Sequence, residues 1–106
     1  MAIYIQRGET IDFVNGTDAA IAAGAVVSLA TRIGIAAAPI AAGETGAVHV
    51  TGVFEIEKKS GEALTVGAAV YYSADGITAT STDNVPAGWV IAAAAASDAT
   101  VRVKIG

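Results

Sequence analysis

The segment 47–57 constrains the fold of this chain more than any other part of the sequence. Its large apolar residues at even positions alternate with polar residues on both sides of Gly52. They are Val48, Val50, Phe54 and Ile56. A period of two is typical of a β-strand with one buried face, because successive side chains point to opposite faces. We expect one long strand over 47–57, with a bulge or a close backbone contact at Gly52.

The composition favours β-structure throughout the chain. The sequence contains 11 Ile and 12 Val against 2 Leu, and β-branched side chains suit pleated surfaces better than helix faces. The 25 Ala residues are the main counterargument, because Ala is the best helix former. A helix over 87–99 therefore remains an alternative, although Gly88 and the pair Val90 and Ile91 oppose it.

Short alternating segments separated by turn residues cover most of the chain. Besides 47–57, we expect strands over 2–6, 10–14, 25–29, 32–37, 69–73, 77–81, 89–94 and 100–105. Asn15-Gly16 is a turn signal, and Asp75-Gly76 predicts the tip of a hairpin. The connections are too short for crossover helices. The chain is therefore predicted to be all-β, one domain over 1–106, a compact antiparallel β-barrel or β-sandwich of about 8–9 short strands with little or no helix.

An internal duplication is one of two readings of the repeated small-residue segments. The segments beginning at Gly24, Ile35 and Val48 can be laid against those beginning at Gly67, Ile91 and Val101. Coincidence among common residues explains these matches equally well. The sequence alone leaves both readings open.

Charge and composition argue against several classes of partner. The net charge is −4 and the basic residues are scattered, whereas binding to a nucleic acid backbone needs clustered Lys and Arg. The apolar span 19–42 contains Arg32 and is interrupted by Gly24, Gly34 and Pro39, so we do not expect it to cross a membrane. Without cysteine there can be no disulfide and no thiolate metal site.

Few residues suggest catalysis. His49, the single histidine, is expected to be an exposed strand residue, and Glu55 and Glu57 beside Lys58 are expected to form a solvated strand end. The glycines do not form a phosphate-binding loop. We therefore predict no enzyme, no catalytic residue, no metal and no cofactor. An enzyme that uses Glu55, Glu57 and His49 is the weaker alternative.

Two groups of residues are candidates for contact with a partner. The segment 1–7 alternates apolar and polar residues without turn signals, so it can be a contact arm that adds a strand to a neighbour, or an ordinary first strand. Adjacent tyrosines in a strand point to opposite faces, which leaves one for a partner. The candidates are Ile3, Tyr4, Ile5, Gln6, Arg7, Tyr71, Tyr72 and Trp89.

Several segments spread over nearly the whole chain carry a resemblance to a known family. Gly52-Val53-Phe54-Glu55 within 48–56 is the most specific segment. The others are Gly8-Glu9-Thr10-Ile11, Ala22-Ala23-Gly24 with Val26-Val27, Ile33-Gly34-Ile35-Ala36, Ala41-Ala42-Gly43-Glu44, Gly67 with Val70-Tyr71-Tyr72, and Thr100-Val101-Arg102-Val103. With these segments the chain resembles the small capsid cement or decoration proteins of tailed bacteriophages. Some members of this family carry a RecA/RadA-like recombinase label, which the missing phosphate loop and the acidic charge oppose here.

The resemblance implies a structural virion protein made in the bacterial host cytoplasm. Such a protein binds the outer surface of an icosahedral head and stabilises contacts between capsomers of the major capsid protein. It is expected to be a homo-oligomer, with a trimer favoured over a dimer, because capsid lattices offer symmetry axes. The family supplies no catalytic residues. A non-catalytic carbohydrate-binding or adhesion module is the alternative, with Trp89, Tyr71 or Tyr72 as stacking platforms.

Overall fold

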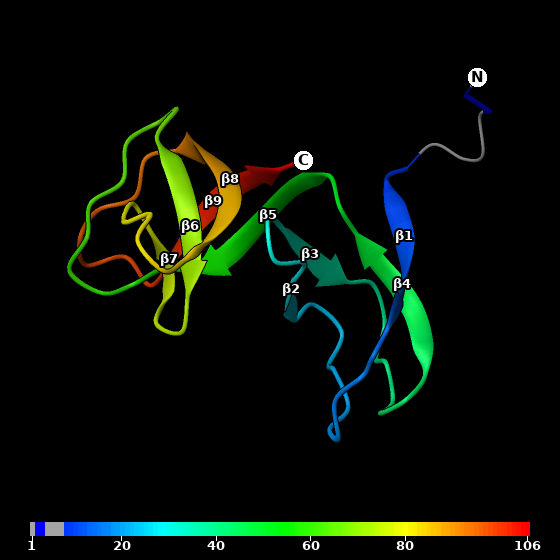
Figure 1. Ribbon diagram of the computed structural model, residues 1–106. Coiled ribbons are helices and arrows are strands. Elements are labelled where there is room, and N and C mark those ends of the chain that lie inside the picture. Colours follow the sequence, from blue (N-terminus) through cyan, green and yellow to red (C-terminus); the bar gives the residue numbers. More distant parts are fainter. Residues whose placement is uncertain (1, 4–7) are drawn as a thin grey trace.

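The computed structural model describes residues 2–3 and 8–106, and the regular structure within them is entirely β-strand. Four strands form one antiparallel sheet in the order β1-β4-β3-β2, and five form another in the order β5-β9-β8-β6-β7. The two sheets lie side by side in a flat molecule of 39 × 37 × 23 Å (Figure 1). The strands are β1 (Thr10–Val14), β2 (Val26–Ser28), β3 (Ile33–Ala36), β4 (Thr45–His49), β5 (Gly52–Glu57), β6 (Ala69–Ser73), β7 (Gly76–Thr78), β8 (Val85–Ala92) and β9 (Thr100–Ile105).

The predicted all-β fold is confirmed, with two sheets in a sandwich-like arrangement and no closed barrel among the described residues. The bounds of β1, β6 and β9 are those predicted, and β6 and β7 form the predicted hairpin, with Ser73 opposite Gly76. The helix over 87–99 is wrong, since β8 covers its first half. The predicted strand 2–6 lies largely outside the described residues, of which 2–3 have no regular structure.

The single long strand predicted over 47–57 is wrong. β4 ends at His49 in one sheet, and β5 begins at Gly52 in the other. Gly52 has a φ of 126°, a conformation that side-chain-bearing residues rarely adopt, so the chain changes direction here. Val48 is buried in one core and Ile56 in a different one. The period of two was correct on each side of Gly52, but the two halves serve separate cores.

The two sheets share one topology, which resolves the question of internal duplication. We call residues 10–49 the first unit and residues 52–105 the second unit. The order β1-β4-β3-β2 corresponds to β5-β9-β8-β6, and β7 is an addition to the second unit. Backbone hydrogen bonds between turns recur at equivalent places. The matched pairs are Ile21–Ile40 with Leu64–Ala94, Gly24–Ala36 with Gly67–Val90, and Asn15–Glu44 with Lys58–Ala99, and the turn bond Glu44–Ala41 recurs as Asp98–Ala95 with one extra residue before β9.

The structure also corrects the register of the duplication. Gly24 corresponds to Gly67, as the sequence comparison placed it. Val48 pairs with Ala36 and Val103 pairs with Val90, so Val48 corresponds to Val103 and not to Val101. By the same pairing, Ile35 corresponds to Trp89. Sliding a strand by two positions preserves its alternation of faces, so an Ala- and Val-rich sequence does not distinguish the two registers.

One glycine at the centre of each sheet has the same structural role in both units. Gly34 in β3 and Gly88 in β8 correspond to each other and lie opposite Val27 and Val70. A Cβ at Gly34 would collide with the Val48 side chain, and one at Gly88 would collide with the backbone carbonyl of Lys104. Both units therefore need a residue without a side chain where β3 crosses β4 and where β8 crosses β9.

The two cores are unequal in size, and β3 of the first unit contributes side chains to both of them. One face of β3 joins the small core of the first unit, around Val27, Ala36, Ile40 and Val48. The other face carries Ile33 and Ile35 into the larger core of the second unit. All four residues of β3 are buried. The first unit therefore depends on the second to cover one face of its sheet.

Each unit also buries one polar side chain just after its first strand. Asn15 donates from Nδ2 to the carbonyls of Ala19 at 2.8 Å and Ile40 at 3.0 Å. Lys58, its counterpart, is only 5% exposed and donates from Nζ to the carbonyls of Glu62 at 2.6 Å, Lys59 at 3.0 Å and Ala96 at 3.3 Å. The interpretation of Lys58 as part of a solvated strand end is therefore wrong.

The added strand β7 curls the second sheet. The amide of Lys59 donates to the carbonyl of Ile77 at 2.9 Å, so β7 touches the end of β5 at the opposite edge of the same sheet. Ile77 is fully buried in the core that this curling encloses. The first unit has no counterpart of β7, and its sheet stays open.

Candidate binding surfaces

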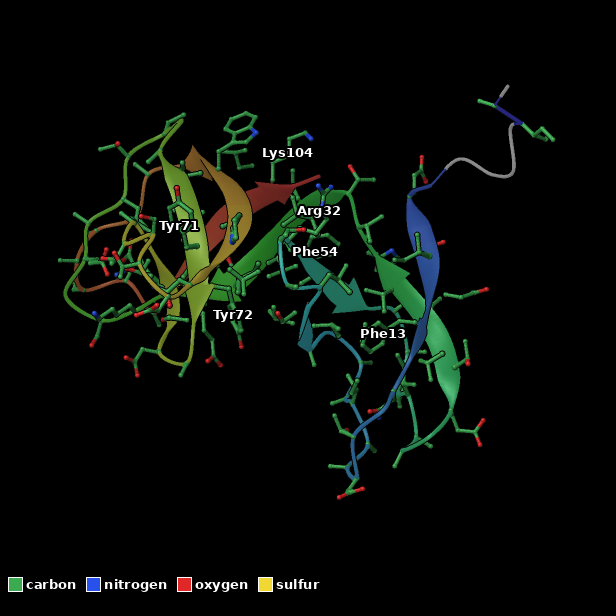
Figure 2. All side chains as sticks on the ribbon, in the orientation of Figure 1. Phe13, Arg32, Phe54, Tyr71, Tyr72 and Lys104 are labelled. Carbon is green, nitrogen blue, oxygen red and sulfur yellow. The ribbon has the colours of Figure 1, made fainter. Side chains whose placement is uncertain are left out.

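An open cleft of about 710 Å³ lies between the two units. The first unit lines it with β2, β3 and the end of β4, and the second unit with β5 and the hairpin of β6 and β7. Its apolar lining includes Val26, Ile35, Phe54 and Ile56. Figure 2 shows Phe54 and Tyr72 in the region between the units. The cleft combines an apolar floor with the free edge of β5.

The structure brings His49, Glu55 and Glu57 to the lining of this cleft. His49 is half-buried, with its ring centroid 5.8 Å from that of Phe54, so the prediction of an exposed strand residue is wrong. Glu55 lies opposite Arg102 on β9, and the two side chains approach to 3.9 Å while both stay exposed. Such an exposed pair contributes little to stability. Glu57 is exposed, as predicted.

The predicted contact residues fall in three different places. Tyr72 is half-buried in the cleft, Tyr71 is half-buried on the other face of β6, and Trp89 is 44% exposed outside the cleft lining. The aromatic residues therefore do not line one groove. In the predicted arm, Ile3 is 72% exposed, and Tyr4, Ile5, Gln6 and Arg7 lie outside the described residues.

A second surface lies on the outer face of the second sheet. Strand pairing places Val53 opposite Lys104, Lys104 opposite Trp89, and Trp89 opposite Ala69. We call these four residues the Trp89 row. Val53 is 51% exposed and Trp89 is 44% exposed, so two large apolar side chains flank one lysine. Sequence reasoning selected Trp89 but missed the row, because the row depends on the pairing of four strands.

One carboxylate is bound firmly at the end of the second unit. Glu62 accepts a hydrogen bond of 2.6 Å from the Thr78 hydroxyl and one of 3.1 Å from the Ala79 amide. These hydrogen bonds lower the pKa of Glu62 from its ordinary value of 4.5, the Thr78 hydroxyl contributing most. The contact ties the turn after β5 to the end of β7. Glu62 is thus a structural residue that the sequence did not reveal.

Residues 2–3 and 8–106 contain neither a cluster of metal-binding side chains nor a membrane-spanning helix. Within these ranges, His, Asp and Glu residues form no group of three able to hold a metal ion. No helix in the same part of the chain is long and apolar enough to span a membrane.

Comparison with known proteins identifies the family. The family model described as phage cement protein matches residues 5–105, nearly the full length of the chain. The chain belongs to the phage cement protein family. The suspected resemblance is therefore confirmed. Among curated proteins and solved structures, the searches found no match.

Membership gives this cement protein a structural role as a component of the virion capsid. It also implies association with capsid proteins. The cleft and the Trp89 row are the two surfaces from which such contacts can be argued.

Proposed function

We propose that this cement protein binds the outer surface of an icosahedral phage head and stabilises contacts between capsomers of the major capsid protein. The observation that carries the proposal is the family match over residues 5–105. The protein acts by binding alone, without catalysis, a cofactor, nucleic acid or a membrane. Each contact can be modest in area, because many copies on one shell act together.

The duplication supports this role. A cement protein must hold two neighbouring subunits, and two units of one topology in a single chain place two contact surfaces at a fixed separation. Because the units share the larger core through Ile33 and Ile35, they are joined rigidly and do not behave as two domains on a flexible linker. Stiff linkage of two contacts raises the effective concentration for the second contact once the first has formed.

We further propose that the protein is a homo-oligomer, a trimer in preference to a dimer, seated on a local symmetry axis of the capsid. The segment 1–7 is proposed as a contact arm toward the capsid. The exposed side chain of Ile3 is consistent with an arm that reaches a neighbour.

The test of the capsid role uses expanded empty heads that lack the protein. We expect the purified protein to co-sediment with these heads at saturation and to raise the temperature at which the empty shells break. A bovine albumin sample of equal concentration controls for trapping. Heads that bind no protein, or bind it without any gain in resistance to heat or shear, would contradict the proposal.

The arm is tested by deleting residues 2–6. We expect the truncated protein to melt at an unchanged temperature, because the described strands begin at Thr10, and to bind heads more weakly. Unchanged affinity for the heads would reject the arm without affecting the rest of the proposal.

A further inference from the structure

The Trp89 row has an exact counterpart in the first unit. Pairing places Thr10 opposite His49, His49 opposite Ile35, and Ile35 opposite Val26. These four residues, which we call the Ile35 row, correspond one by one to Val53, Lys104, Trp89 and Ala69. The same face of the same fold is therefore present twice in each chain.

The two rows differ in what covers them. Ile35 is only 5% exposed, because the second unit packs on its row with Phe54 and Tyr72. Trp89, at the equivalent position, is 44% exposed, and its neighbour in the row, Val53, is 51% exposed. Figure 2 shows Lys104 on β9 away from Phe54 and Tyr72. The Ile35 row is thus partly covered within the chain, most completely at Ile35, whereas the two large apolar side chains of the Trp89 row are exposed.

The covering residues of the second unit also have counterparts. Ile11 of β1 corresponds to Phe54 of β5, because each lies opposite the equivalent valine of the neighbouring strand, Val48 and Val103. By the same pairing, Asp12 corresponds to Glu55. Ile11 is half-buried and Asp12 is exposed, so this edge of the first unit is accessible. The molecule therefore has the exposed Trp89 row on its second unit and, on its first unit, the accessible edge of β1 that corresponds to the covering edge of β5.

We propose that the Trp89 row is the docking surface for a second copy of this chain, which covers it with the β1 edge of its first unit. The contact repeats between chains the packing that joins the two units within one chain. Charge also fits, because the Trp89 row carries Lys104 and the β1 edge carries Asp12. Opposite charges at these equivalent positions favour one orientation of docking over others.

This contact is head-to-tail, since it joins different surfaces on the two copies. A head-to-tail contact closes into a ring when its rotation divides a full turn, and otherwise forms a filament. A ring of three rests on the trimer proposed above, whereas the contact itself does not depend on capsid binding. In such a ring, the second unit of each chain contacts the first unit of the next chain, in the way that the two units contact each other within one chain.

The first experiment compares Trp89→Glu with Val66→Glu. Val66 is 61% exposed and lies outside both rows, so the same substitution there controls for charge and solubility. By analytical ultracentrifugation without capsids, we expect the wild type and the Val66 variant to share one oligomeric mass and Trp89→Glu to be monomeric and folded. A wild type that is monomeric at its highest soluble concentration, or a Trp89→Glu protein that keeps the oligomeric mass, overturns the proposal.

The second experiment tests the orientation of the contact. Ile11→Lys places an ammonium group opposite Lys104 of the neighbouring copy and is expected to give a monomer. Mixing Ile11→Lys with Trp89→Glu should give a heterodimer and nothing larger, because one intact row then meets one intact edge. An Ile11→Lys protein that is folded and still oligomeric, or two folded monomers that do not combine, overturns the head-to-tail contact.

A third pair covers the case in which Ile11→Lys does not fold. Asp12 and Lys104 are substituted by charge reversal, Asp12→Lys and Lys104→Glu. Each alone is expected to weaken association severalfold, and the double variant to recover the wild-type dissociation constant. Recovery of the wild-type dissociation constant in the double variant supports the contact. If both single variants fold and associate more weakly but the double variant does not recover, the contact is rejected. Because these measurements need no heads, their failure is distinct from failure of the capsid role.

Discussion

The two units of this cement protein have the same strand order but different surroundings. In the second unit, β7 lies against β6, touches the end of β5 and curls the sheet around its own core. In the first unit no such strand is present among the described residues, and one face of the sheet is buried against the second unit instead. The comparison shows that the shared strand order does not determine which positions are buried. Burial depends on what packs on each sheet, and equivalent positions can therefore hold Ile35 in one unit and Trp89 in the other.

The largest loss of stability is expected from substitutions of the central glycines, which change the strand pairing that the two units share. Gly88→Ala places a Cβ against the Lys104 carbonyl at a φ of 147°, and no side chain can move to relieve this collision. We expect a loss of at least about 3 kcal/mol in the free energy of unfolding, measured by urea denaturation. Gly34→Ala meets the Cγ1 of the fully buried Val48, a side chain and not the backbone, so a smaller cost of about 1–3 kcal/mol is expected. Equal costs would contradict the predicted difference between a collision with backbone and a collision with a side chain.

The next effect concerns the strand that only the second unit has. Ile77 of β7 is fully buried in the larger core, and Ile77→Ala is expected to cost about 2–5 kcal/mol through lost burial and a residual cavity. Because Ile33 and Ile35 belong to the same core, unfolding should remain one transition by both fluorescence and circular dichroism. Two separate transitions would mean that the units fold independently, against the shared core.

The two buried polar side chains give a direct comparison between units. Lys58→Met keeps most of the side-chain stem but leaves three carbonyls without their donor, and Asn15→Ala leaves two. We expect each variant to lose about 1–3 kcal/mol, measured by chemical denaturation, with Lys58→Met at least as costly. A neutral Lys58→Met would indicate that water replaces the ammonium group and that the two sites are not equivalent.

The smallest effect is expected at Glu62, which has no carboxylate counterpart in the first unit because Ala19 occupies the equivalent position. Its lowered pKa means that the folded state binds a proton more weakly than the unfolded chain. The stabilisation is therefore present above pH 4.5 and is lost as the pH falls through the lower folded pKa. Glu62→Gln should cost at most about 1 kcal/mol at neutral pH.

The measurement for Glu62 is the difference in urea midpoint between the wild type and Glu62→Gln as a function of pH. We expect this difference to shrink well below pH 4.5. Glu44→Gln, at an exposed turn of the first unit, is the matched control with no expected difference. A difference that does not change with pH would show that the carboxylate charge is not what Thr78 and Ala79 recognise.

Local pattern predicted much of this fold, and long-range pairing accounts for what it missed. The alternation in 10–14, 69–73 and 100–105 gave the exact bounds of three strands, because a period of two is local information. The same alternation continued through Gly52 and concealed a change of sheet, since only residues 50–51 and the positive φ of Gly52 separate the two strands. The duplication was visible but slipped in register, because alternating Ala and Val match equally well two positions away.

The candidate surfaces were harder to predict than the strands. Trp89, a candidate contact residue in the sequence, is 44% exposed, and its neighbours Val53 and Lys104 lie far from it in the sequence. His49 was expected in solvent because it lies opposite the apolar face of its strand, and Phe54 of the second unit comes beside it only in the folded chain. Lys58 was interpreted from its charge, and its burial follows from three carbonyl acceptors that converge on one point. Each of these outcomes depends on segments that meet only after folding.

The position of Ile33 and Ile35 in the core of the second unit also affects how the chain is made. Ribosomes synthesise the N-terminal half first, and domains made this way usually begin to fold before the rest follows. Here that half carries an uncovered apolar face until residues 52–105 have emerged. We therefore expect nascent chains that stop near His49 to be captured by chaperones, and completion of the second unit to release them.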